Sequence, residues 1–121
     1  MAANINITAC DNELIIIAFT PSISYQIGRI LSGNNQGVSV TLNLVEDTYV
    51  GGPTLNGTNN PLNDVIDVCL PAGTYSLFLC GINWGGPTAF AGTVTDSNGI
   101  QTPINNNLGI NVNQLIAPFQ V

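Results

Sequence analysis

The chain has 121 residues, of which one is arginine, seven are aspartate or glutamate, and none is lysine or histidine. A chain of this length has room for one domain, and we expect residues 1–121 to form it. One basic side chain cannot neutralise a row of phosphates, so this composition argues against nucleic acids and anionic membrane surfaces as partners. Without histidine the commonest general base and metal ligand are missing, and we expect no enzyme.

Apolar and polar residues alternate along most of the chain, which predicts β-strands. In chain order the predicted strands cover residues 4–8, 13–19, 22–31, 38–45, 64–70, 74–82, 88–95, 100–104 and 110–116. The strand at 13–19 is a nearly continuous apolar run, as expected for a strand buried on both faces or packed at an edge. Residues 32–37 predict a turn, and residues 46–63, which have no periodicity, predict a long loop.

Many short strands separated by turn residues predict an all-β fold, namely an antiparallel two-sheet sandwich of about eight strands, immunoglobulin-like or jelly-roll. No run approaches the roughly 18 apolar residues of a membrane-spanning helix, so we expect no membrane insertion. Residues 1–10 show neither the basic segment nor the continuous apolar segment of a signal peptide.

One segment, Leu70-Pro71-Ala72-Gly73-Thr74-Tyr75, is followed by alternating apolar residues and resembles the tyrosine corner of immunoglobulin-like and fibronectin type III sandwiches. The resemblance implies a sandwich in which Tyr75 enters a core strand and hydrogen-bonds back to the preceding turn. The chain departs from antibody domains because Trp84 follows the corner instead of preceding it. The resemblance covers about ten residues and implies no activity.

The chain contains three cysteines, Cys10, Cys69 and Cys80, so at least one has no partner within the chain. Two interpretations stay open. The thiols are buried and reduced, as free cysteines commonly are, or Cys10, near one end of the chain, forms a disulfide with a neighbouring subunit.

The carboxylates suggest one metal site. Asp64 and Asp67 lie close to Asn63, and carboxylate and amide oxygens are ligands that Ca²⁺ prefers. Their spacing matches no EF-hand loop or calcium-binding repeat, and solvated surface side chains are the commoner explanation. Calcium is thus a candidate cofactor at Asn63, Asp64 and Asp67, and the composition indicates no other cofactor.

A neutral binding site can be built from an aromatic platform with a few amide and hydroxyl groups. Trp84, the only tryptophan, is flanked by Asn83 and Thr88, and Tyr49 lies in the predicted long loop. These four residues predict a glycan-binding site, and the alternative is that Trp84 closes one end of the core. A lectin-like module is therefore one of two functional predictions.

The other prediction is a self-assembling structural subunit of an extracellular filament, appendage or coat, with further copies of itself as partners. The low charge removes repulsion between copies, and no lysine protects a sheet edge against pairing. Both terminal segments are apolar and are candidates for adding a strand to a neighbouring sheet. The predicted assembly residues are Ile5, Ile7, Cys10, Leu115, Ile116 and Phe119. An extracellular location is expected because lysine-poor chains rich in asparagine, threonine and glycine are common there.

Overall fold

The computed structural model describes residues 2–33, 36–110 and 112–121, and these residues form nine strands without a helix. The strands are β1 (Asn4–Phe19), β2 (Ser24–Ser32), β3 (Val38–Glu46), β4 (Thr54–Gly57), β5 (Leu62–Leu70), β6 (Thr74–Ile82), β7 (Ala89–Thr95), β8 (Gln101–Pro103) and β9 (Asn113–Gln120). The predicted all-β class is confirmed. Residues 34 and 35 of the predicted turn, and Asn111 of the last predicted strand, lie outside the described residues. In the described ranges no helix has the length and hydropathy needed to cross a membrane.

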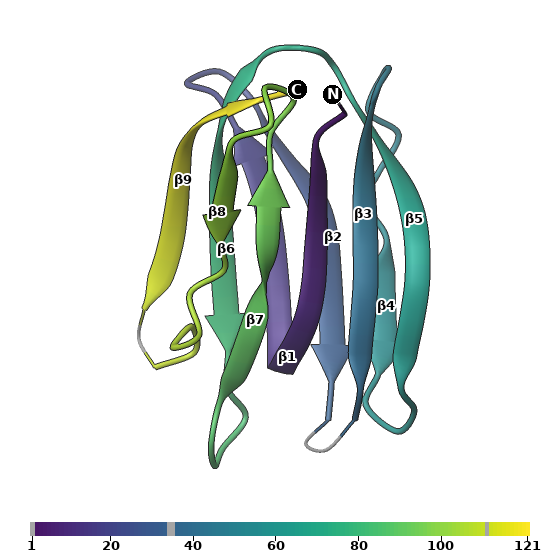
Figure 1. Ribbon diagram of the computed structural model, residues 1–121, viewed down its shortest axis with the longest axis vertical. Coiled ribbons are helices and arrows are strands. Elements are labelled where there is room, and N and C mark those ends of the chain that lie inside the picture. Colours follow the sequence, from purple (N-terminus) through teal and green to yellow (C-terminus); the bar gives the residue numbers. More distant parts are fainter. Residues whose placement is uncertain (1, 34–35, 111) are drawn as a thin grey trace.

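The long strand β1 lies at the centre of the fold and joins the two predicted strands 4–8 and 13–19 into one. Its first half pairs antiparallel with β3 and β7, and Ile5 is in register with both Leu42 and Val94. Its second half, from Asn12 onward, pairs antiparallel with β2 and β6. In Figure 1, β1 runs away from the end that carries both termini, bends, and returns. β1 therefore pairs directly with β2, β3, β6 and β7, and these four strands pair with the remaining four.

The strands form a curled, mixed sheet, so the prediction of an antiparallel arrangement is wrong and two separate sheets are not confirmed. Strand β4 pairs parallel with β2, and β5 pairs parallel with β3. The reason lies in residues 46–63, which were expected to be a loop but contain β4. After β3 the chain crosses to β2, where it forms β4, and then returns to the side of β3 as β5. This crossover connection lets β5 run in the same direction as β3.

The core is formed by the alternate residues of each strand that face inward. On β1, Ile5, Ile7, Leu14 and Ile16 are completely buried. Phe90 on β7 and Phe119 on β9 are the largest fully buried side chains. The buried positions therefore follow a period of two within each half of β1, although this period does not reveal which strands are neighbours.

The predicted hydrogen bond of the tyrosine corner is confirmed. The Tyr75 hydroxyl donates to the Pro71 carbonyl oxygen at 2.6 Å, and the Tyr75 ring is buried. The local turn is therefore the one that the resemblance implied. The parallel pairs formed by β4 and β5 show that the local motif does not determine the arrangement of the strands around it.

Replacing Tyr75 by phenylalanine should lower the free energy of unfolding by roughly 1 to 2 kcal/mol, because the Pro71 carbonyl loses its partner beside the core. Urea unfolding should show a lower midpoint with an unchanged slope. Tyr49→Phe is the matched control, because the Tyr49 hydroxyl also donates to a carbonyl oxygen, that of Gln26 at 2.7 Å, but in an exposed position. Equal losses for the two variants would contradict a special role for the corner.

Candidate functional site

The structure does not bring the candidate calcium ligands together. Asn63, Asp64 and Asp67 all lie on the exposed edge strand β5, where alternate side chains point to opposite faces. Asp64 therefore points away from the side shared by Asn63 and Asp67, which are four residues apart. Asp67 instead accepts a hydrogen bond from Asn43 on β3 at 3.4 Å. Among the described residues no group of three or more acidic, cysteine or histidine side chains is placed to hold a metal ion.

Trp84 lies on the connection between β6 and β7 and is 52% exposed. Its backbone N–H donates to the Asn12 side chain at 2.9 Å, which attaches this connection to the bend of β1. The neighbouring Asn83 side chain donates to the Gly86 carbonyl at 2.8 Å, and Thr88 follows on the same connection, half-buried. The structure thus places three of the four predicted glycan-binding residues on one connection and does not bury Trp84 in the core.

Tyr49, the fourth predicted glycan-binding residue, lies at the opposite end of the molecule. Its ring is 4.7 Å from the ring of Tyr25, which in turn is 6.2 Å from that of Tyr75 at the start of β6. Trp84 follows the end of the same strand. Because a strand rises about 3.3 Å per residue, roughly 30 Å separates the two positions. Tyr49 and Trp84 therefore do not share a site for one sugar.

Most of the predicted assembly residues are part of the core. Buried side chains belong to Ile5, Ile7, Cys10 and Phe119. The N-terminal segment cannot be donated to a neighbouring sheet while this fold persists, because it is the first half of the central strand. On β9, by contrast, Leu115 is 60% exposed and Ile116 is half-buried.

Cys10 is a poor candidate for a link between subunits. Its thiol is buried and contacts the Ile30 carbonyl oxygen at 3.4 Å and the Asn12 carbonyl oxygen at 3.7 Å. Burial raises the pKa of the Cys10 thiol to about 12, and the nearby carboxylates of Asp11 and Glu13 act in the same direction. The reactive thiolate is therefore suppressed. All three cysteines are free in the structure, and Cys69 and Cys80 are half-buried.

The outermost strands are protected against pairing without lysine. β4 has four residues and β8 has three, and β8 ends in Pro103. β9 contains Pro118, which has no backbone N–H to donate. The longer edge strand β5 carries Asp64 and Asp67. Short strands, prolines and charges are recognised ways to prevent edge pairing, so all four edge strands carry at least one such feature.

The outer side of four neighbouring strands, β2, β1, β6 and β9, carries large apolar side chains. We call the following residues the apolar face: Ile15, Ile17, Phe19, Phe78, Cys80 and Leu115. On β1, its members alternate with buried Leu14 and Ile16, so they point outward. Ile17 is in register with Phe78 on β6, and Phe78 with Leu115 on β9. The result is an apolar row across three strands, on the side of the sheet away from the core.

Polar residues border the apolar face. They are Ser24, Gln26 and Arg29 on β2, Ser76 on β6 and Asn113 on β9. The Arg29 Nε atom lies 2.6 Å from the Glu13 Oε2 atom, so the one cation of the chain is paired with a carboxylate. An apolar centre with a polar border is the usual anatomy of a protein interface.

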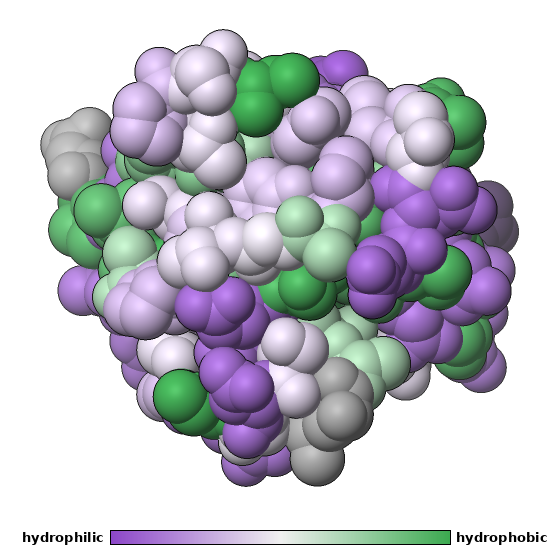
Figure 2. Space-filling model, turned by 90° about the horizontal axis from the view of Figure 1, so that it is seen from above, coloured by the Kyte–Doolittle hydropathy of each residue, from purple (hydrophilic) through white to green (hydrophobic). Residues whose placement is uncertain are grey.

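The outer side of the other strands is different. There β1, β3 and β7 present Asn4, Asn6, Ser39, Thr41, Asn43 and Thr93. Asn6 donates to Thr41 across the strands at 2.9 Å. On the end of the molecule shown in Figure 2, apolar residues are scattered among polar ones. Exposed Val45 on β3 and Val65 on β5 also lie on this side, but the register places Asn43 and Asp67 between them.

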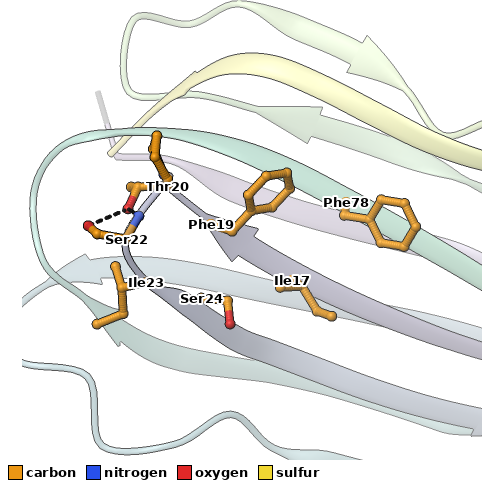
Figure 3. A pocket seen from close by; sticks show the side chains of 8 residues that line it. Ile17, Phe19, Thr20, Ser22, Ile23, Ser24 and Phe78 are labelled. Atoms are coloured by element: carbon orange, nitrogen blue, oxygen red, sulfur yellow. Dashed lines mark hydrogen bonds between the residues drawn. The ribbon is translucent and has the colours of Figure 1, made fainter.

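An open groove of about 520 Å³ lies where the apolar face meets the connection from β1 to β2. Phe19, Phe78 and Ile17 come from the strands, and residues 20–24 provide the other wall, with Ile23 47% exposed (Figure 3). The wall is stabilised by the Thr20 N–H, which donates to the Ile23 carbonyl at 2.8 Å. The groove is therefore a formed hollow at one border of the apolar face.

The apolar face was not predicted, although a signal for it exists. The run at 13–19 is apolar at consecutive positions, and a strand with one solvated face should alternate. Ile15, Ile17 and Phe19 are the additional apolar residues, and they are the outward ones. The same surplus occurs at Phe78, between buried Leu77 and Leu79.

No protein-family model matches the chain, and no curated protein or solved structure shows significant similarity to it. Its function is therefore inferred from the geometry of the chain itself.

Proposed function

We propose that the chain is a self-associating structural subunit of an extracellular assembly, and that copies meet through the apolar face. The observation that carries this proposal is a contiguous row of outward-facing apolar side chains, Ile17, Phe78 and Leu115, on a sheet with a packed core on its other side. Leu115 is 60% exposed, whereas Ile17 and Phe78 are half-buried, and contiguous apolar areas on a protein surface mark interaction sites. The extracellular location is supported by composition alone.

The apolar face and its polar border together extend over four strands. With strands about 4.8 Å apart and about seven residues in each, their flat projection is roughly 450 Å². Each partner in a stable interface buries about 800 Å², so this surface would form the central part of a larger contact.

The distribution of charge favours a second copy as that partner. The chain has a formal net charge of −6, so the limited repulsion between two copies comes from its seven carboxylates. The carboxylates other than Glu13 lie away from the apolar face, at Asp11, Glu46, Asp47, Asp64, Asp67 and Asp96. Glu13 itself is paired with Arg29. Two copies therefore approach through this face with the least repulsion.

This proposal replaces the route predicted from the sequence, in which terminal strands are exchanged and Cys10 forms a covalent link. The only support for the glycan-binding alternative is the connection between β6 and β7, which carries Trp84. Tyr49 does not contribute to it, because Tyr49 lies near the other end of β6. We favour self-association because the apolar face is a larger continuous surface than the connection that carries Trp84.

The three cysteines provide a test that needs no mutation. Cys80 lies on the apolar face, Cys69 lies on β5 on the other side of the molecule, and both are half-buried. Sedimentation velocity under reducing conditions should show assembly with rising concentration. Iodoacetamide labelling, mapped by mass spectrometry, should slow roughly tenfold at Cys80 when about nine-tenths of the chains are assembled, and stay constant at Cys69.

Buried Cys10 serves as the unreactive internal standard in the same experiment. A monomer at every concentration would refute the proposal. Assembly that leaves Cys80 labelling unchanged would show that the copies meet elsewhere.

A further inference from the structure

We propose that Tyr25 and Tyr49 form a covalent cross-linking site, at which oxidation by a peroxidase and hydrogen peroxide joins the two rings through a carbon–carbon bond. The chain contains three tyrosines, and the structure gathers all of them in one cluster, although they come from distant segments. The site does not depend on the proposed self-association, because both of its tyrosines belong to the same chain.

The two rings are already in contact in the folded chain. Tyr25 lies near the start of β2, and Tyr49 lies on the connection between β3 and β4. Their ring centroids are 4.7 Å apart and their planes are inclined by 43°. This distance is near the lower end of the about 4.5 to 7 Å found between packed aromatic rings. A radical formed on one ring therefore has the other ring as its nearest aromatic neighbour.

The connection that carries Tyr49 is attached to β2. The Tyr49 hydroxyl donates to the Gln26 carbonyl oxygen at 2.7 Å. A Cβ atom on Gly52 would overlap the same carbonyl oxygen, so the connection runs directly against the strand. The Arg29 N–H donates to the Pro53 carbonyl at 3.0 Å. These contacts hold the hydroxyl end of the Tyr49 ring toward β2, and the ring carbons that couple are those beside the hydroxyl-bearing carbon.

Tyr75, the third tyrosine, is less suited to coupling. Its ring is 6% exposed, and its centroid lies 6.2 Å from that of Tyr25, with an angle of 67° between the planes. Its hydroxyl donates to the Pro71 carbonyl at 2.6 Å. Burial raises the pKa of Tyr75, and Tyr25 acts in the same direction, so its phenolic proton is harder to remove. Tyr25 and Tyr49, by contrast, are half-buried and have atoms at the surface.

The reaction balances with hydrogen peroxide as the oxidant. Each tyrosine gives up one electron and its phenolic proton and becomes a phenoxyl radical. The two radicals combine in a bond between one ring carbon of each, and the hydrogen atoms on those carbons move to the oxygens and restore both hydroxyl groups. The peroxide takes up the two electrons and two protons and becomes two water molecules, so the chain loses two hydrogen atoms in total.

The bond would close the chain between residues 25 and 49, a loop that contains the whole of β3. It would fix the crossover connection on β2. A covalent closure reduces the conformational freedom of the unfolded chain and so stabilises the fold. The three cysteines are free and provide no such closure.

The test is oxidation of the folded chain, with its accessible thiols blocked by iodoacetamide, by a peroxidase and hydrogen peroxide. The expected product is a single chain lighter by two hydrogen atoms, with dityrosine fluorescence and a link between Tyr25 and Tyr49 in peptide mass spectra. The yield per chain should stay constant on dilution, because the reaction is intramolecular. The product should unfold at a higher urea concentration than the untreated chain.

Tyr25→Phe and Tyr49→Phe should each lose the link completely, since phenylalanine keeps the ring but has no phenolic hydrogen. Circular dichroism checks that both variants fold like the wild type. Tyr75→Phe is the matched control and should retain the link.

Three results would overturn the site: no intrachain link in the folded wild type, a main link between Tyr25 and Tyr75, or the same mixture of links in the folded chain and in urea. A link that forms only between chains counts as the first of these. A wild type that is monomeric at every concentration would refute self-association, and the intrachain link would still be expected.

Discussion

Replacing Gly92 by alanine is expected to lower the free energy of unfolding by roughly 3 to 5 kcal/mol, a large part of the total stability of a domain of this size. Gly92 lies on β7 in register with Ile7, beside an irregularity in the pairing of β1 and β7, and has a φ of 151°. A Cβ atom there would overlap the Asn6 carbonyl oxygen and would lie 2.9 Å from the Ile104 Cδ1 atom.

Neither neighbour of Gly92 can move cheaply. Asn6 belongs to the half of β1 that is paired on both sides, so displacing its carbonyl disturbs two strand pairs. Ile104 is held by its own N–H, which donates to the Gly92 carbonyl at 2.9 Å. The strained backbone adds to the cost.

Urea unfolding measures the effect, and Gly37→Ala is the control. A Cβ on Gly37 meets no atom within 4 Å, so that variant should be neutral or more stable by up to about 1 kcal/mol. A Gly92→Ala protein as stable as the Gly37→Ala protein would show that β7 does not press against β1 as described.

Alkaline pH is expected to destabilise the fold through Cys10. In the folded chain, burial raises the pKa of this thiol from 9.0 to about 12. Above pH 9 the unfolded chain therefore loses the proton while the folded chain keeps it, so raising the pH favours unfolding. The stability associated with this group is complete below pH 9 and falls by roughly 1.4 kcal/mol per pH unit, or about 4 kcal/mol by pH 12.

Comparison with Cys10→Ala isolates this effect. The variant loses buried volume at every pH, but its free energy of unfolding should fall less steeply between pH 9 and pH 12 than that of the wild type. The pKa of Tyr75 is also raised, by burial and by Tyr25, and this contribution is present in both proteins and cancels. Parallel curves for the two proteins would mean that Cys10 titrates normally and is not buried as described.

The pairing of the strands explains why the location of the proposed self-association surface was difficult to predict. Leu115 was identified from its apolar character in a terminal segment, but its neighbours Phe78 and Ile17 lie 37 and 98 residues earlier in the chain. Their proximity depends on which strands pair, and that is not encoded in any local pattern. The surplus of apolar residues at 13–19 indicates an outward apolar surface on one strand but does not identify the strands beside it.

Properties that arise from local chemistry could be predicted from the amino-acid sequence. Alternation places every second side chain on the same side of a strand, so the all-β class followed directly. Ile5 and Ile7 were nevertheless predicted to be assembly residues, and the structure buries them in the core. The turn at Pro71 and the hydrogen bond from Tyr75 also followed, because both partners lie within four residues of each other.

The direction and order of the strands depend on pairing between distant segments and could not be predicted from local patterns. Residues 46–63 contain β4, which carries the chain to β2 before it returns beside β3, and β5 therefore runs parallel to β3. The periodicity of apolar residues does not show the direction of a strand relative to its neighbours. The same pairing made the N-terminal segment a central strand, buried Cys10, and separated Tyr49 from Trp84. It also set Ile17, Phe78 and Leu115 in one row. Local patterns determine which face of a strand is apolar, whereas pairing between distant segments determines which apolar faces meet in the core and which remain outside.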